Sequence, residues 1–241
     1  MWLMLAIACV DEEALALEME RGIFASNEAI DAALVASEVF RWTQAEPTVT
    51  LRHGTSCGCP CRDRTDAGDG FVLLADYAEL GCFPDSDLLP FPVQGHITLL
   101  VEGDEAAASL DGLLLDAREP VTGAPSATVD ALTGAADIRG RIDVASMAAE
   151  LDVTVKHEPD AVRISGDVTV PSGVVHLDDV RIRHEDVFGT CPTPSDGAAR
   201  VDAEKGPIEV QLGLGEGDTE ATYRDRTSSV VPYCAYRPDW W

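Results

Sequence analysis

The stretch that decides the fold is Asp137-Ile-Arg-Gly-Arg-Ile-Asp-Val144 together with Leu151-Asp-Val-Thr-Val-Lys156. Apolar and polar residues alternate in both segments with a period of two. Successive side chains of a β-strand point to opposite faces, so this alternation places one face in a core and the other in water. The stretch therefore predicts half-buried antiparallel strands.

The same pattern extends in both directions from this stretch. Turn-forming residues such as Glu158-Pro-Asp160 and Pro171-Ser-Gly173 separate the segments. Eight to eleven strands at short spacing predict a mainly β protein, an antiparallel meander that forms a curved sheet or an up-and-down, barrel-like domain. The further strand-like segments are 48–52, 72–74, 97–101, 110–115, 162–170, 180–182 and 208–214.

The N-terminal part of the chain has the helical period instead. Apolar residues in 12–42 recur at the i, i+3 and i+4 spacing of one helix face, and Pro47 ends the pattern. Gly22 is expected to interrupt the helix, and Ser26 to cap a second segment. We expect a signal remnant at 1–8, a tether and helical segment at 9–46, and one antiparallel β domain at 47–241.

Composition excludes two classes of partner. The 241 residues carry 43 Asp and Glu against 17 Lys and Arg, a net charge of −26. Nucleic acids and anionic lipid surfaces are bound through basic patches, so neither fits this chain. No apolar run approaches the ~18 residues of a transmembrane helix. The segment from Thr65 to Ala117 has no Lys or Arg, and is where we expect a cation or a basic partner.

The first nine residues, Met1-Trp-Leu-Met-Leu-Ala-Ile-Ala-Cys9, form an apolar run that ends in small residues before a cysteine. They resemble the end of a bacterial lipoprotein signal, in which the chain is cut before a cysteine that receives diacylglycerol. The resemblance implies lipidation at Cys9 and a place in the bacterial cell envelope, at the outer membrane, with the lipid as the membrane partner. The alternative is a buried apolar N-terminal segment with an incidental cysteine.

A second resemblance lies further along the chain. Ala75-Asp-Tyr77, Gly81-Cys82 and Gln94-Gly-His-Ile-Thr98 are similar to a pattern in uncharacterised bacterial envelope lipoproteins. This resemblance implies no known activity and assigns no catalytic residue.

The cysteine count fits an exported protein. With Cys9 lipidated, an even number of cysteines remains, which predicts three disulfides in an oxidising compartment. We expect the cluster at 57–61 to pair with Cys82, and Cys191 with Cys234. The alternative is a tetrahedral zinc site formed by the cluster with His53 and Cys82. The disulfide candidates are Cys57, Cys59, Cys61, Cys82, Cys191 and Cys234.

Four further motifs contain residue types that can carry chemistry. Gly54-Thr-Ser-Cys-Gly58 matches a nucleophile elbow, but a cysteine-rich loop follows it where the elbow needs a helix. His176 and His184 flank a strand near Asp178 and Asp179, an arrangement that is either an acid–base pair or a set of solvated charges. The acidic segment 63–70 is either a calcium-binding loop or a solvated hairpin tip. The aromatic residues of 233–241 either stack on a ligand or pack against the rest of the fold.

These patterns favour a lipid-anchored envelope protein with a binding or structural role, whose protein or glycan partner the sequence does not identify. The alternatives are an exported hydrolase with an unrecognised site and a β-barrel carrier of a small apolar ligand. The sequence assigns no catalytic, cofactor-binding or metal-ligating residue.

Overall fold

A computed structural model describes residues 12–44, 61–77, 92–110, 112–115, 119–130, 132–145, 147–188, 191–214 and 219–230. It consists of one long helix, α1 (Glu12–Gln44), and one antiparallel sheet. The described strands are β1 (Cys61–Ala67), β2 (Gly70–Asp76), β3 (Val93–Gln94), β4 (His96–Glu102), β5 (Glu105–Ser109), β6 (Leu113–Leu115), β7 (Glu119–Gly123), β8 (Ser126–Val129), β9 (Ala135–Val144), β10 (Met147–His157), β11 (Ala161–Val170), β12 (Gly173–Phe188), β13 (Cys191–Ala203), β14 (Gly206–Gln211), β15 (Thr219–Tyr223) and β16 (Arg226–Val230).

The sheet is open and its strands follow chain order. The main path runs β1-β2-β4-β5-β8 and then through β9 to β16, while β3, β6 and β7 form a side branch that joins β9. Within the described residues β1 pairs only with β2 and β16 only with β15, so the sheet is not closed. The predicted mainly β fold with an N-terminal helix is confirmed, and an open sheet takes the place of the barrel-like alternative.

The two faces of the sheet differ as the alternation predicts. On the inner face, the predicted apolar residues of β9, β10 and β11 are between 0 % and 4 % exposed. Among the apolar residues predicted to face inward further along the chain, Leu214 is 54 % exposed, because it follows the end of β14. The inward residues named here are Ile138, Ile142, Val144, Leu151, Val153, Val155, Val162, Ile164, Val168 and Val170.

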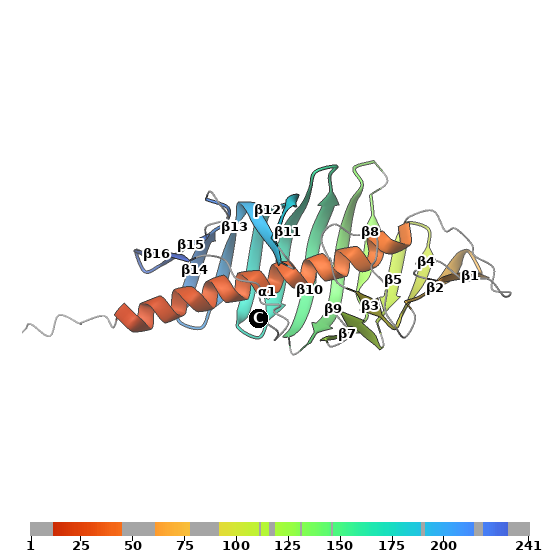
Figure 1. Cartoon of the computed structure of the whole chain (residues 1–241), viewed down its shortest axis with the longest axis horizontal. Coiled ribbons are helices and arrows are strands. Elements are labelled where there is room, and N and C mark those ends of the chain that lie inside the picture. Colours follow the sequence, from red (N-terminus) through yellow and green to blue (C-terminus); the bar gives the residue numbers. More distant parts are fainter. Residues whose placement is uncertain are drawn as a thin grey trace, which may run out of the picture.

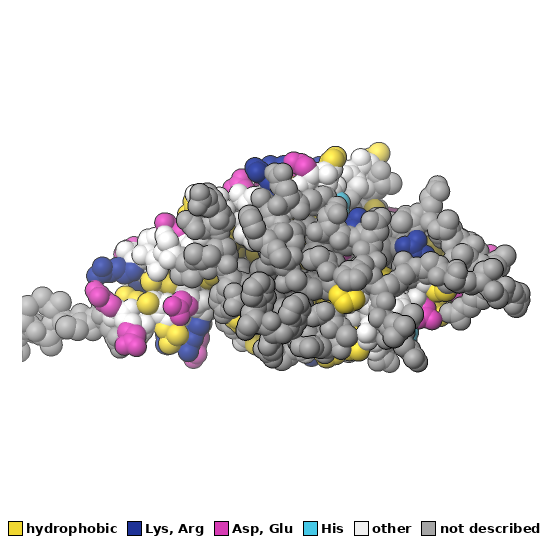
Figure 2. Space-filling model, in the orientation of Figure 1, with side chains coloured by type: hydrophobic (Ala, Val, Ile, Leu, Met, Phe, Trp, Pro, Cys, Tyr) yellow, Lys and Arg dark blue, Asp and Glu magenta, His cyan; other side chains and the backbone are white. Residues whose placement is uncertain are grey.

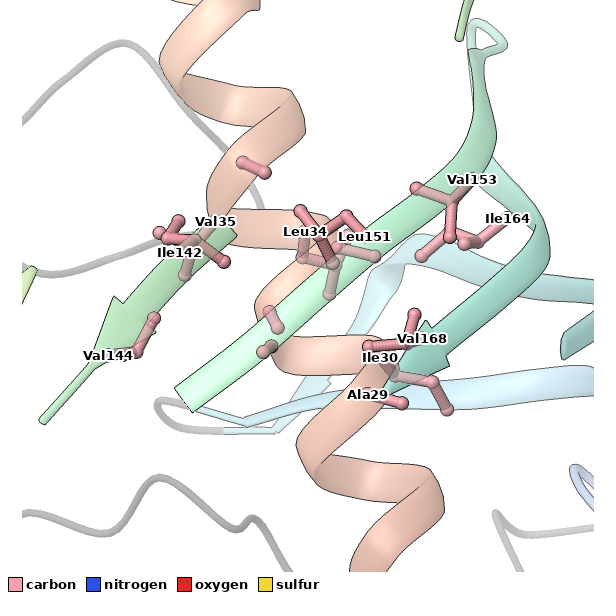
Figure 3. Packing of buried hydrophobic residues seen from close by; sticks show 14 of the residues in the cluster. Ala29, Ile30, Leu34, Val35, Ile142, Val144, Leu151, Val153, Ile164 and Val168 are labelled. Atoms are coloured by element: carbon pink, nitrogen blue, oxygen red, sulfur yellow. The ribbon is translucent and has the colours of Figure 1, made fainter. Parts of the chain in front are cut away.

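Helix α1 crosses this inner face from one end of the sheet toward the other (Figure 1). Ile30 lies against Val168, Leu34 against Leu151, and Val35 beside Ile142 (Figure 3). Helix and sheet thus share one hydrophobic core. From Ala25 to Phe40 every residue of α1 except Asp31 is buried, so the helix is enclosed on all sides.

The predicted break in the helix does not occur. Helix α1 is continuous through Gly22, and the Ser26 hydroxyl donates a hydrogen bond to the Gly22 carbonyl one turn earlier, at 2.9 Å, in place of capping a new segment. A Cβ at Gly22 would lie 2.6 Å from Cγ2 of Ile208 in β14. The glycine therefore lets the helix approach the sheet closely, and this packing outweighs its low helix propensity.

We expect Gly22→Ala to destabilise the protein by about 1 kcal/mol, measured by urea unfolding. Alanine gains ~1 kcal/mol of helix propensity, but overlap with the buried Ile208 costs ~1–3 kcal/mol. Ile208→Ala removes Cγ2, so the double variant should lose less stability than the sum of the single variants. Glu20→Ala, on the exposed side of the same turn, is the control. A stabilised Gly22→Ala variant would contradict the close approach.

Candidate functional site

The outer face of the sheet carries a row of charged side chains centred on His176 in β12. Its Nδ1 lies 2.7 Å from Asp167 Oδ1 in β11, and its Nε2 lies 3.2 Å from Asp202 Oδ2 in β13. Arg200 Nε is 3.1 Å from the other oxygen of Asp202. The hydrogen bond to Asp167, followed by that to Asp202, raises the pKa of His176, and the bond to His176 lowers the pKa of Asp202.

Similar ion pairs join other neighbouring strands on the same face. Arg139 reaches Asp152 at 2.9 Å, linking β9 to β10, and Arg163 reaches Asp179 at 2.6 Å, linking β11 to β12. Each exposed pair contributes little stability by itself. Together they cancel charge across the outer face of β9 to β13, which we name the ion-pair half.

The predicted acid–base pair around His176 takes a different form. Its acidic partners are Asp167 and Asp202 on the adjacent strands, and neither Asp178 nor Asp179 approaches it among the contacts of the described residues. Strand β12 has an irregular register after Asp178, and Asp179 has a φ of 48°. This bulge directs Asp179 to Arg163. The side chain of His184 lies outside the described residues.

A cavity of about 290 Å³ lies between the first turns of α1 and the turn that joins β13 to β14. Glu18 is 7 % exposed on its wall, and its carboxylate lies 2.6 Å from Lys205 Nζ and 3.0 Å from Arg21. The hydrogen bond from Lys205 holds the pKa of Glu18 below its usual value. Tyr223 donates a hydrogen bond to the Lys205 carbonyl at 2.9 Å, which fixes the turn.

The rest of the cavity is mainly apolar, with Val201, Ala203 and Ile208 among its lining residues. Ser172 also lines it and hydrogen-bonds Glu28 of α1. Burial raises the pKa of Glu28, and the bond to Ser172 partly opposes that rise. The cavity thus combines an apolar wall with the charged pair of Glu18 and Lys205, the combination by which pockets bind and orient small molecules.

One serine–histidine contact lies within the core. Ser37 of α1 and His157 of β10 are 3.3 Å apart between Oγ and Nε2, although they are 120 residues apart in the chain. The Ser37 hydroxyl also lies 3.2 Å from the Leu34 carbonyl, and the residue is only 3 % exposed. A nucleophile needs access to substrate, so this contact links helix to sheet and is not an active site.

Of the remaining predicted sites, most of the cysteines and two of the motifs lie outside the described residues. Cys61 begins β1 and is disulfide-bonded. Cys9, Cys57, Cys59, Cys82 and Cys234 lie outside the described residues, as does the side chain of Cys191, so the connectivity and the lipidation stay predictions. The motif at 54–58 and the aromatic residues of 233–241 also lie outside them.

The acidic segment 63–70 forms the hairpin of β1 and β2, with its turn at Gly68 and Asp69. Asp63 and Asp66 pair with Leu74 and Phe71 at odd and even positions of β1, so they point to opposite faces and do not converge on one ion. Across the described residues there is no group of three or more histidine, cysteine or acidic side chains that could hold a metal.

Comparisons with known proteins find no matching family model, no similar curated protein and no similar solved structure. In the described part of the chain, no helix combines the length and the hydrophobicity needed to cross a bilayer.

We expect Glu18→Gln to lower the free energy of unfolding at pH 7 by about 1–2 kcal/mol, because a partly buried charge-assisted hydrogen bond to Lys205 is lost. A carboxyl group whose pKa is lowered by folding stabilises the fold at pH values above its unfolded-state pKa of about 4.5. This stabilisation is lost as the pH falls through the folded-state pKa. The difference between the two proteins should therefore shrink on acidification below pH 4.5. Glu20→Gln, exposed on the same helix, is the matched control. A constant difference would exclude the ion pair as its cause.

The His176 cluster predicts the opposite pH dependence. A histidine whose pKa is raised by folding contributes its full stabilisation below its unfolded-state pKa of about 6.5. The contribution is lost as the pH rises through the folded-state pKa. Because His176 is 40 % exposed at its side chain, the contribution is below about 1 kcal/mol. An NMR titration of the imidazole should show the pKa falling in Asp167→Asn but unchanged in Asp160→Asn, which removes the carboxylate that pairs with Arg181. Equal shifts would mean that net charge sets the pKa.

Proposed function

We propose that this protein is a lipid-anchored component of the bacterial cell envelope, at the outer membrane, with a binding or structural role. The anchor would be Cys9, preceded by the lipoprotein-like residues Leu5, Ala6, Ile7 and Ala8. This role requires a folded domain that begins close to Cys9 and an exposed surface or cavity that can bind a partner.

The start of α1 is the observation that carries the proposal. The helix begins at Glu12, so only Val10 and Asp11 separate it from Cys9. A tether this short spans about 10 Å at full extension. The 33 residues of α1 extend roughly 50 Å beyond it, at ~1.5 Å per residue. An acyl chain on Cys9 would thus hold a rigid arm, with the β14–β16 end nearest the membrane (Figure 1).

Three features of the described residues support a binding or structural role. Helix α1 fills the inner face, and the ion-pair half of the outer face is satisfied by its own charges. At the β14–β16 end, acidic and basic side chains lie next to one another on the visible surface (Figure 2). The cavity beside Glu18 suits a small ligand. An enclosed lumen, which a barrel carrier requires, is not formed by the open sheet of the described strands.

The direct test is metabolic labelling of the full chain, expressed in a Gram-negative bacterium, with radioactive palmitate. The wild type should incorporate label and sediment with the membranes, whereas Cys9→Ala should do neither. Val10→Ala, which changes the neighbouring residue but keeps the thiol, should behave as the wild type. Equal labelling of wild type and Cys9→Ala, or none in either, would reject lipidation.

A further inference from the structure

The outer face of the sheet changes character toward β1. On β2, β4 and β5 the outward positions carry Val72, Leu100 and Ala107, which lie directly opposite one another, with Leu74 two residues along β2. Leu100 is 41 % exposed, and Ala107 is exposed as well. We name this surface the apolar patch. It continues across the sheet to Ser126 in β8, and the ion-pair half begins at the next strand with Arg139.

Carboxylates border the apolar patch. Glu102 and Glu105 face each other across the β4–β5 turn on the same side of the sheet, and Asp63 lies opposite Leu74 on β1. These three acids are exposed, and none of them forms an ion pair with a described cation. Their charge therefore stays uncompensated, in contrast to that of the ion-pair half.

The nearby arginines belong to the other face. Arg64 of β1 lies opposite the buried Leu73, and its guanidinium stacks 3.9 Å from the centre of the Phe71 ring. Arg62 lies opposite the buried Ala75. Side chains alternate along a strand, so both arginines point away from the apolar patch. The outward side of β2, β4 and β5 carries no Lys or Arg among the described residues.

We propose that the apolar patch is a docking surface for a protein segment that presents lysine or arginine around apolar side chains. The inference rests on the binding role proposed above. Exposed leucine provides the apolar contact, and Glu102 with Glu105 selects a cationic partner through complementary charge. A second copy of this chain would bring like charges together, and an anionic membrane would be repelled, so neither fits the surface.

The test measures binding of a fluorescent peptide of alternating lysine and leucine to the full chain in non-ionic detergent. The matched peptide with glutamate in place of lysine, and that with serine in place of leucine, should bind at least about tenfold more weakly. Leu100→Asn should weaken binding of the lysine–leucine peptide by about tenfold, since one buried leucine contact is lost. The Glu102→Gln/Glu105→Gln variant should weaken it and reduce its salt dependence.

Two variants with the same chemistry elsewhere are the controls. Leu132→Asn removes a leucine that is 98 % exposed in the turn between β8 and β9, and Asp178→Asn/Asp225→Asn removes two exposed carboxylates. Both should bind as the wild type, and thermal unfolding should show that all variants fold. Absent binding, or equal losses in the controls, would overturn the docking surface. The assay does not depend on lipidation, so a failed palmitate experiment leaves its result interpretable.

Discussion

The structure depends on the burial of one helix against one face of a sheet. A sheet with a single apolar face cannot remain in water unless something covers that face. Helix α1 meets this need along β9 to β16. The helix depends on the sheet in turn, since Gly22, Asn27, Asp31 and Ser37 all have weak helix propensity and tertiary packing must stabilise it. Neither element is expected to be stable without the other.

This arrangement explains how the sheet stays open. A wide sheet with an apolar inner face commonly closes into a barrel, where strands cover one another. Here the helix already occupies the space that a barrel interior would need, and the strands extend beyond it in chain order (Figure 1). The open sheet has two ends, β1 and β16, whose exposed residues are mostly polar or charged, which disfavours edge-to-edge association.

The sequence predicts those parts of the fold that depend on residues close together in the chain. It does not predict the candidate sites, because they bring together residues that are distant in the chain. The alternation in Ile138–Val155 assigns each side chain to a face without knowledge of any partner strand. The continuity of α1 depends on how closely Ile208 approaches Gly22, which no neighbouring residue encodes. The Glu18–Lys205 pair joins residues 187 apart, and His176 finds Asp202 only through the register of β12 and β13. Asp167 could have been proposed as the partner of His176 from the sequence, but only if the register of the β11–β12 hairpin had been known.

The net charge of −26 acquires a location through this geometry. Most of the arginines in β9 to β13 form ion pairs with carboxylates of the same strand, a neighbouring strand or a turn, so their charges are balanced locally in that half of the outer face. Carboxylates without an ion pair to a described cation remain at β1–β5, the end of the arm farthest from Cys9 in the proposed anchoring, and also at Glu12, Glu13 and Glu20 near the start of α1. The β1–β5 end lies roughly 50 Å along α1 from the proposed anchor, several Debye lengths of ~8 Å, so the rigidity of α1 and not charge repulsion would hold it away from the lipid. The length of α1 would then keep the apolar patch accessible.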